Sequence, residues 1–145
     1  MSNRKEETLY HAMFLAQHLN KCDLKDGLVY ILFELDVDKG RLGYHYVKDA
    51  ILLFHKDPIH TLLSGIYQKV AENIDPFINS EYIEKNIRDV IGKSYRDCEP
   101  EIWAYYFPEK AGRKPSKPNN YKFISNISAF MELWQACCKE ASYEI

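Results

Sequence analysis

The chain has 145 residues, of which 46% are hydrophobic and 28% charged, and its formal net charge at pH 7 is −2. This profile is typical of a soluble globular protein, and the length suits one domain with a continuous core better than two. No apolar run approaches the ~20 residues that span a bilayer, and the N-terminal residues lack the apolar core of a secretory signal. We therefore expect a cytoplasmic protein with no membrane partner.

The cysteines and histidines do not predict a metal site. The four cysteines, at positions 22, 98, 137 and 138, form no CxxC pair, and no set of them with histidines has the full spacing of a zinc site. The five histidines come without an HExxH signature, and no glycine-rich phosphate loop is present, so each histidine is expected at the surface. The sequence predicts free thiols, no metal or other cofactor, no small-molecule substrate and no enzymatic activity.

Helical periodicity dominates the first half of the chain, and no segment alternates as a half-buried strand does. We expect four helices here, over Glu6–Leu19, Lys25–Leu35, Tyr44–His55 and Pro58–Asn73. Residues 36–43, with two glycines, are typical of a turn. Pro58 suits the first turn of the fourth helix, because the N–H that proline lacks has no partner there.

The apolar spacing also predicts which helix faces are buried. In the first helix the buried residues are expected to be Leu9, Met13, Ala16 and Leu19. In the fourth they are expected to be Leu62, Leu63, Ile66, Tyr67 and Val70.

The second half of the chain predicts two long helices separated by a looser segment. Asp75–Pro76 ends the fourth helix, and Asn79 or Ser80 can cap a fifth that runs to Tyr95. Several prolines then leave room only for a short helix near residues 101–107. A final helix from Asn119 or Asn120 to Lys139 directs Phe123, Ile124, Ile127, Phe130, Met131 and Trp134 inward. The predicted fold class is an all-α bundle of six to seven helices.

The fifth helix has two faces of different chemistry. Stepping about 100° per residue gathers Ile83, Ile87, Val90, Ile91 and Ser94 on one face. The opposite face carries Glu81, Lys85, Arg88, Asp89 and Gly92. Two helices joined by a short turn are compatible with a helix-turn-helix, whose second helix reads the major groove. The alternative is a solvated face with near-balanced charges, because amphipathic helices are common.

The reading chemistry follows from the residue types on that helix. Lys85 and Arg88 can donate to guanine O6 and N7, and Glu84 can accept from a cytosine amino group. A second basic region lies further along, where Lys110, Arg113, Lys114, Lys117 and Lys122 face only Glu109, a local excess of +4. This segment is either a phosphate-contacting element or a solvated basic loop.

Three segments resemble a known family in the same order along the chain. They read GYHYVKDAI at 43–51, IYQKVA at 66–71 followed by SEYIEKNIR at 80–88, and KPNNYKFI at 117–124. These are similar to G-Y-x-Y-L-R-E-A-I, to Y-P-x-I-A followed by S-R-V-E-R-A-I-R, and to K-P-T-N-S-E-F-I. Those patterns belong to the C-terminal effector domain of the sporulation stage-zero protein A, a bacterial response regulator.

The resemblance implies a six-helix bundle with a helix-turn-helix that is not a winged helix, and a transcription regulator that binds specific duplex DNA sequences. Members commonly bind as tandem dimers, so DNA and a second copy are the implied partners. The expected reading residues are Ser80, Glu81, Tyr82, Glu84, Lys85 and Arg88. The expected phosphate-contacting residues are Arg113, Lys114 and Lys117.

Individual positions of the reading helix depart from the family pattern. Glu84 and Arg88 keep the family's acidic and basic base-reading residues. Lys85 replaces an arginine, which keeps the charge but loses the bidentate fork. Tyr82 replaces another arginine and Asp89 replaces a histidine, so the reading face is less positive and its target sequence is expected to differ.

The expected organisation is an N-terminal helical extension at residues 1–22 followed by the DNA-binding domain at 23–145. In the full regulator a receiver domain precedes the effector domain, whereas about twenty residues here are too few for one. The Glu6–Leu19 helix either takes part in dimerisation or completes the core.

An alternative function is a protein-interaction module. In that case the chain keeps the bundle, has lost DNA reading, and modulates a full-length regulator by forming a heterodimer with it. The acidic net charge and the replacements at Tyr82 and Asp89 favour this alternative.

Overall fold

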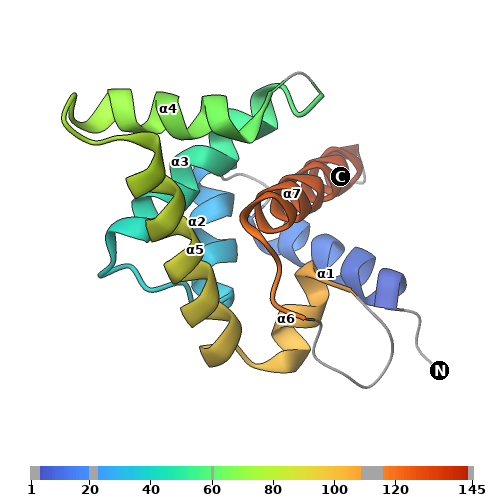
Figure 1. The fold of residues 1–145 in the computed structure, drawn as a ribbon. Helices are drawn as coiled ribbons and strands as arrows, with labels where there is room; N and C mark the ends of the chain where they lie inside the picture. The colour runs from blue at the N-terminus through green and yellow to red at the C-terminus, as the bar shows by residue number, and fades with distance from the viewer. Residues whose placement is uncertain (1–3, 20–22, 60, 109–115, 144–145) are drawn as a thin grey trace.

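The computed structural model describes residues 4–19, 23–59, 61–108 and 116–143, and these residues form α-helices and no strand (Figure 1). The seven helices are α1 (Arg4–Leu19), α2 (Leu24–Glu34), α3 (Leu42–Lys56), α4 (Leu63–Ile74), α5 (Ser80–Asp97), α6 (Pro100–Tyr106) and α7 (Asn120–Tyr143). The predicted all-α fold class is confirmed. In the described part of the chain no helix is long and apolar enough to cross a membrane.

Short polar side chains fix where three of the helices begin. Asp23 accepts a hydrogen bond from the Asp26 N–H at 2.8 Å before α2. Asn79 accepts one from the Tyr82 N–H at 2.9 Å before α5, and Asn119 accepts one from the Lys122 N–H at 2.7 Å before α7. Each bond satisfies an N–H that has no partner within the helix. The predicted starts of the fifth and final helices are therefore confirmed.

The fourth helix begins later than predicted, at Leu63 rather than at Pro58. Pro58 lies in a turn after α3, and the Thr61 hydroxyl donates a hydrogen bond to the Asp57 carbonyl oxygen within the connection. Leu62 is extended and precedes the helix, so its side chain is 75% exposed instead of buried as predicted. The helix buries Ile66, Tyr67, Val70 and Ala71.

The buried face of α1 also differs from the prediction. Leu9 and Met13 are 40% and 43% exposed, while Ala12, Leu15 and Ala16 are almost fully buried. α1 packs against α7 and α6, and small side chains at the contact allow helix backbones to approach closely. The helix is therefore rotated toward its alanines, and larger apolar side chains remain at the surface.

Two glycines allow close approach between helices in the core. A Cβ at Gly43 would lie 2.2 Å from the Asn86 carbonyl oxygen, so α3 lies directly against the α5 backbone. A Cβ at Gly27 would lie 2.4 Å from the ring of Trp134, so α2 accommodates this large side chain of α7. The predicted inward side of α7, from Phe123 to Trp134, is buried. These close contacts bring α3 against α5 and α2 against α7, so α5 and α7 pack on the same core.

The prediction that every histidine lies at the surface is wrong for two of them, His11 and His55. The His11 side chain is 9% exposed and lies 2.8 Å from a Glu34 carboxylate oxygen. His55 is half-buried, with Nδ1 2.7 Å from the Ser128 hydroxyl oxygen. Helical periodicity did not reveal these partners because they lie 23 and 73 residues away in the chain.

The cysteines and potential metal ligands are dispersed. Cys98, Cys137 and Cys138 form no disulfide, and Cys22 lies outside the described residues. Within the described ranges, no three His, Cys, Asp or Glu side chains are grouped so that they could hold a metal ion.

Candidate nucleic-acid interface

α4 and α5 are consecutive helices joined by the turn at residues 75–79. The Asp75 side chain accepts a hydrogen bond from the Phe77 N–H at 2.9 Å, and its carbonyl oxygen accepts one from the Ile78 N–H at 3.0 Å. The two helices pack against each other and run in clearly different directions in Figure 1. Asp75 thus holds the turn that sets the direction in which α5 leaves α4.

The predicted apolar face of α5 is confirmed, since it is buried against the bundle. Ile83, Ile87, Val90, Ile91 and Ser94 are each at most 1% exposed. The Ser94 hydroxyl donates to the Leu35 carbonyl oxygen at 2.6 Å, so this polar group is satisfied inside the core. α5 is consequently fixed by apolar packing over most of its length.

The opposite face of α5 points outward. Ser80 is half-buried, and the exposed residues are Glu81, Tyr82, Glu84, Lys85, Arg88 and Asp89. Gly92, predicted on this face, is instead buried. A Cβ at Gly92 would lie 3.2 Å from Lys117 Nζ and 3.6 Å from Arg96 Nη1, so basic side chains cover it.

Glu84 and Arg88 form an ion pair on the exposed face. Arg88 Nη1 lies 4.0 Å from Glu84 Oε1, and the two side chains are 55% and 50% exposed. A pair this open to water contributes only ~0–1 kcal/mol, because water screens it and ordering both side chains costs entropy. The pair therefore opens easily when a better partner for either residue is present.

Asn120, the first residue of α7, connects the middle of α5 to α4 and α7 by hydrogen bonds. Its Nδ2 donates to the Tyr67 hydroxyl oxygen at 3.0 Å and to the Glu84 carbonyl oxygen at 3.1 Å. Burial raises the pKa of the Tyr67 hydroxyl, and the hydrogen bond from Asn120 opposes that rise. The amide thus joins α4, α5 and α7 at one point. The sequence placed Asn120 at the start of the final helix and in the resembling segment 117–124 but did not predict these hydrogen bonds.

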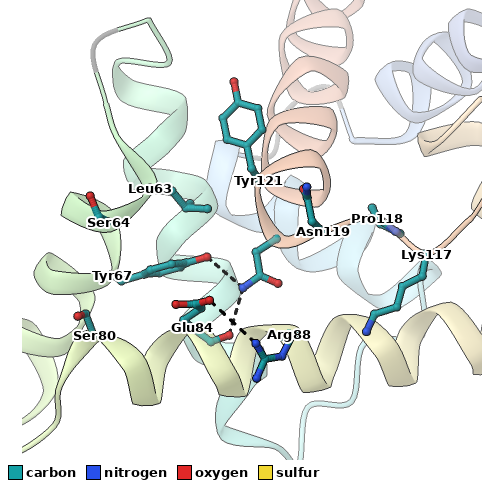
Figure 2. Close-up of a pocket in the computed structure, with 11 residues that line it drawn as sticks. Leu63, Ser64, Tyr67, Ser80, Glu84, Arg88, Lys117, Pro118, Asn119 and Tyr121 are labelled. Carbon is teal, nitrogen blue, oxygen red and sulfur yellow. Dashed lines mark hydrogen bonds and ion pairs between the residues drawn. The ribbon is translucent and has the colours of Figure 1, made fainter.

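An open groove of about 670 Å³ runs beside this point. It is lined by α4 and α5 on one side and by residues 117–121 on the other. Figure 2 shows the Arg88 and Lys117 side chains along the α5 edge of the groove. Arg113 and Lys114, the other predicted phosphate contacts, lie outside the described residues. Arg96, which like Lys117 lies beside Gly92, was missed because it is one residue beyond the predicted end of the helix at Tyr95.

An all-helical bundle, an exposed mixed-charge helix after a short turn, and basic side chains beside that helix are features that DNA-binding regulatory domains share. The family model for the sporulation initiation factor Spo0A C terminal matches residues 28–131. The match covers 104 of the 145 residues, and the chain therefore belongs to this family. The resemblance found in the sequence is confirmed.

The family is one of DNA-binding sporulation regulators and not a family of enzymes. The matched region begins within α2 and ends within α7, so α1 lies outside it. No curated protein matches the chain.

Proposed function

We propose that this protein is a transcription regulator that binds a specific duplex DNA sequence by inserting α5 into the major groove, with α4 and α5 as a helix-turn-helix. The observation that carries the proposal is the division of α5 into a fully buried apolar face and an exposed face. That exposed face carries Glu84, Lys85 and Arg88. A major groove about 12 Å wide admits such a helix and presents donors and acceptors to its side chains.

Arg88 is the principal reader in this proposal. A bidentate contact from arginine to guanine is worth about 1–3 kcal/mol of discrimination against other bases. Opening the exposed pair with Glu84 costs at most about 1 kcal/mol, so the guanine contact prevails. Glu84 is then released to accept from a cytosine amino group. Lys85 donates to a neighbouring base, while Ser80, Glu81 and Tyr82 contact the DNA around the start of the helix.

The phosphates on one side of the groove are contacted by Lys117, together with Arg113 and Lys114. Lys117 already lies over Gly92 of α5, so its charge accompanies the reading helix. The first N–H groups of α7 are close to the same groove, and a helix N-terminus favours an anion. These contacts give affinity that does not depend on sequence.

A selection from randomised duplex DNA tests the proposal. The wild-type protein is expected to enrich one short motif. Arg88→Ala is expected to lose preference at one position by about 1–3 kcal/mol. Lys117→Ala is expected to weaken binding to all duplexes and to lower the salt slope by about one.

Lys139→Ala is the matched control. Lys139 is exposed and lies about 28 Å along α7 from Asn120 at 1.5 Å per residue. It is expected to bind as the wild type does. The proposal fails if the wild-type protein shows no salt-sensitive binding to any duplex pool at low salt.

A second candidate function, a protein-interaction module that pairs with a full-length regulator, is favoured by a different observation. An apolar hollow lies at the N-terminal end of α5, lined in part by Leu42, Phe77 and Tyr82. Phe77 is 93% exposed and Leu42 52%, and exposed apolar side chains gathered in this way are typical of a protein-interaction site. Co-purification with a receiver-containing regulator, lost in Phe77→Ser but kept in Arg88→Ala, would support this function over DNA reading.

A further inference from the structure

A second pocket, of about 500 Å³, lies between α1, α2 and α6. Its lining consists of Glu7, Tyr10, His11, Phe14, Glu34 and Tyr105. Four of these lie on α1 at spacings of three and four residues, so they share one face of that helix. The DNA-binding proposal uses none of them, and α1 lies outside the part of the chain that the family model matches.

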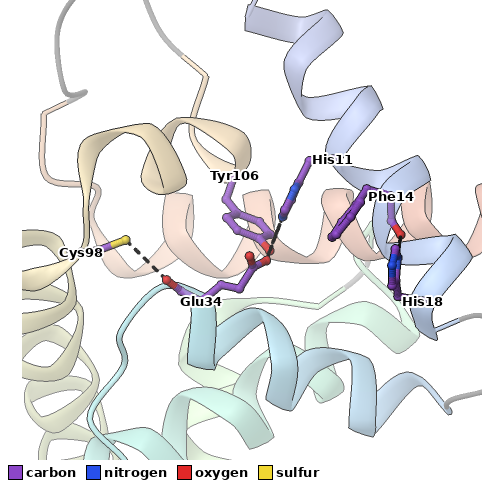
Figure 3. Close-up of polar contacts among 6 residues, drawn as sticks. All are labelled: His11, Phe14, His18, Glu34, Cys98 and Tyr106. Carbon is purple, nitrogen blue, oxygen red and sulfur yellow. Dashed lines mark hydrogen bonds and ion pairs between the residues drawn. The ribbon is translucent and has the colours of Figure 1, made fainter.

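The inner wall of the pocket is a carboxylate held by two neighbours (Figure 3). His11 Nε2 lies 2.8 Å from Glu34 Oε1 and 3.2 Å from the Tyr106 hydroxyl oxygen. The Tyr106 hydroxyl donates to the same Glu34 oxygen. Burial, followed by the Glu34 charge, raises the pKa of Tyr106 well above its usual value, so its hydroxyl stays a neutral donor. The carboxylate is therefore oriented before any ligand arrives.

The side walls of the pocket are aromatic. The Tyr105 ring stacks on the His11 ring with centroids 4.2 Å apart, and Phe14 is stacked on the same imidazole at 6.2 Å. Tyr10 is 63% exposed and Phe14 49%. The face of an aromatic ring carries negative electrostatic potential, and the lining combines three such rings with two carboxylates.

We propose that this pocket binds an organic cation that carries a guanidinium or alkylammonium group. Aromatic faces next to carboxylates attract such cations through cation–π and ionic interactions together. The described residues that line the pocket include two carboxylates and no lysine or arginine. Within the described residues no three His, Cys, Asp or Glu side chains are grouped to hold a metal ion, and a hard metal ion would gain little from aromatic walls.

The experiment uses two probes of nearly equal size, n-butylguanidinium and the neutral n-butylurea. Each is titrated into the full-length, uniformly ¹⁵N-labelled protein and followed by the shifts of backbone amides. We expect saturable shifts at residues of α1, at the C-terminal end of α2 and in α6 with n-butylguanidinium, and at least tenfold weaker binding of n-butylurea. Equal binding of both probes would overturn the proposal, because the pocket would then select apolar surface and not charge.

Variants assign the interaction to the pocket. Glu34→Gln is expected to weaken n-butylguanidinium binding about tenfold or more, because it removes a charge-assisted hydrogen bond. Tyr10→Leu keeps an apolar side chain at a largely exposed position, so it should fold normally and weaken binding about two- to fivefold by losing the cation–π contact. Glu132→Gln, at an exposed position of α7, is the control and should bind as the wild type does. Unchanged affinity in both Glu34→Gln and Tyr10→Leu would contradict the proposal.

Discussion

α5 and α1 are both amphipathic helices packed on the same core, yet their exposed faces differ in chemistry, since that of α5 is charged and that of α1 carries aromatic side chains. α5 buries large branched residues, with Ile83 and Ile87 0% exposed, and shows charged side chains outward. α1 buries Ala12 and Ala16 and leaves Tyr10 and Phe14 at the surface. The two proposals rest on this difference, with bases and phosphates as the proposed ligands of α5 and an organic cation as the proposed ligand of the pocket beside α1. Packing against the core thus decides which side chains each helix leaves exposed, and on α1 these include large apolar ones.

The largest effect on stability is expected from a substitution that pushes α5 away from α3. Gly43→Ala places a methyl group where the Asn86 carbonyl oxygen of α5 lies 2.2 Å away, and backbone cannot give way as a flexible side chain does. We expect a loss of about 1–3 kcal/mol in the free energy of unfolding, measured by urea denaturation. A matched control is Gly65→Ala in α4, where nothing lies within 4 Å and a gain of up to about 1 kcal/mol is expected. Equal effects at the two glycines would contradict the close approach of α3 to α5.

The next largest effect is expected from removing the amide that joins α4, α5 and α7. Asn120→Ala leaves the Tyr67 hydroxyl and the Glu84 carbonyl without this donor, so the free energy of unfolding should fall by about 2 kcal/mol. Tyr67→Phe removes only one of the two bonds and should cost about 1 kcal/mol. The two losses are measured by denaturation. If Tyr67→Phe lowers the free energy of unfolding as much as Asn120→Ala does, the hydrogen bond from Asn120 to the Glu84 carbonyl of α5 contributes nothing to stability.

The buried Tyr106–Glu34 contact beside α1 is tested by measuring the free energy of unfolding as the pH is raised. Because the pKa of Tyr106 is raised in the folded protein, the folded state holds its proton at a pH where the unfolded chain has lost it. The associated stability is therefore complete below the unfolded value, about pH 10, and is lost as the pH rises above it. We expect Tyr106→Phe to be less stable than the wild type at pH 8, because Glu34 loses one donor, and to show a shallower decline above pH 10. Parallel declines would contradict the burial of a neutral hydroxyl beside Glu34.

The smallest effect on stability is expected at the exposed ion pair of α5. Glu84→Gln should change the free energy of unfolding by less than about 0.5 kcal/mol, since both side chains are about half exposed. The same substitution should relax the DNA preference at one base pair, measured by competition between duplexes. A large loss of stability without a change in preference would make Glu84 a structural residue and not a reader.

The sequence predicted the helices and the α5 face well because those features are local. The caps at Asn79 and Asn119 act over three residues. In α5 the branched apolar residues recur at helical spacing on one face and the charged residues lie on the other, so only one face of the helix can be buried. α1 was less predictable because apolar residues surround much of it, so packing against α6 and α7 decided which of them are buried. The late start of α4 has a similar cause, since Pro58 is compatible with both a helix start and a turn.

For the candidate site, the side chains of α5 that are exposed could be predicted from the sequence, but the contacts that hold α5 in place could not. Glu84, Lys85 and Arg88 follow from the helix period. The bonds of Asn120 join residues 36 and 53 positions apart, and the cover of Gly92 by Lys117 depends on the path of the chain between α6 and α7. Such contacts are set by tertiary packing and leave no periodic signal.

The central claim, that α5 reads the major groove, is tested most directly by methylation interference on the duplex selected by the protein. Methylation of guanine N7 blocks the major-groove edge, whereas methylation of adenine N3 blocks the minor groove. We predict that N7 methylation at one or more guanines prevents binding by the wild-type protein. In Arg88→Ala, one of those guanines should no longer matter. Interference confined to adenine N3, or an unchanged guanine pattern in Arg88→Ala, would contradict the account.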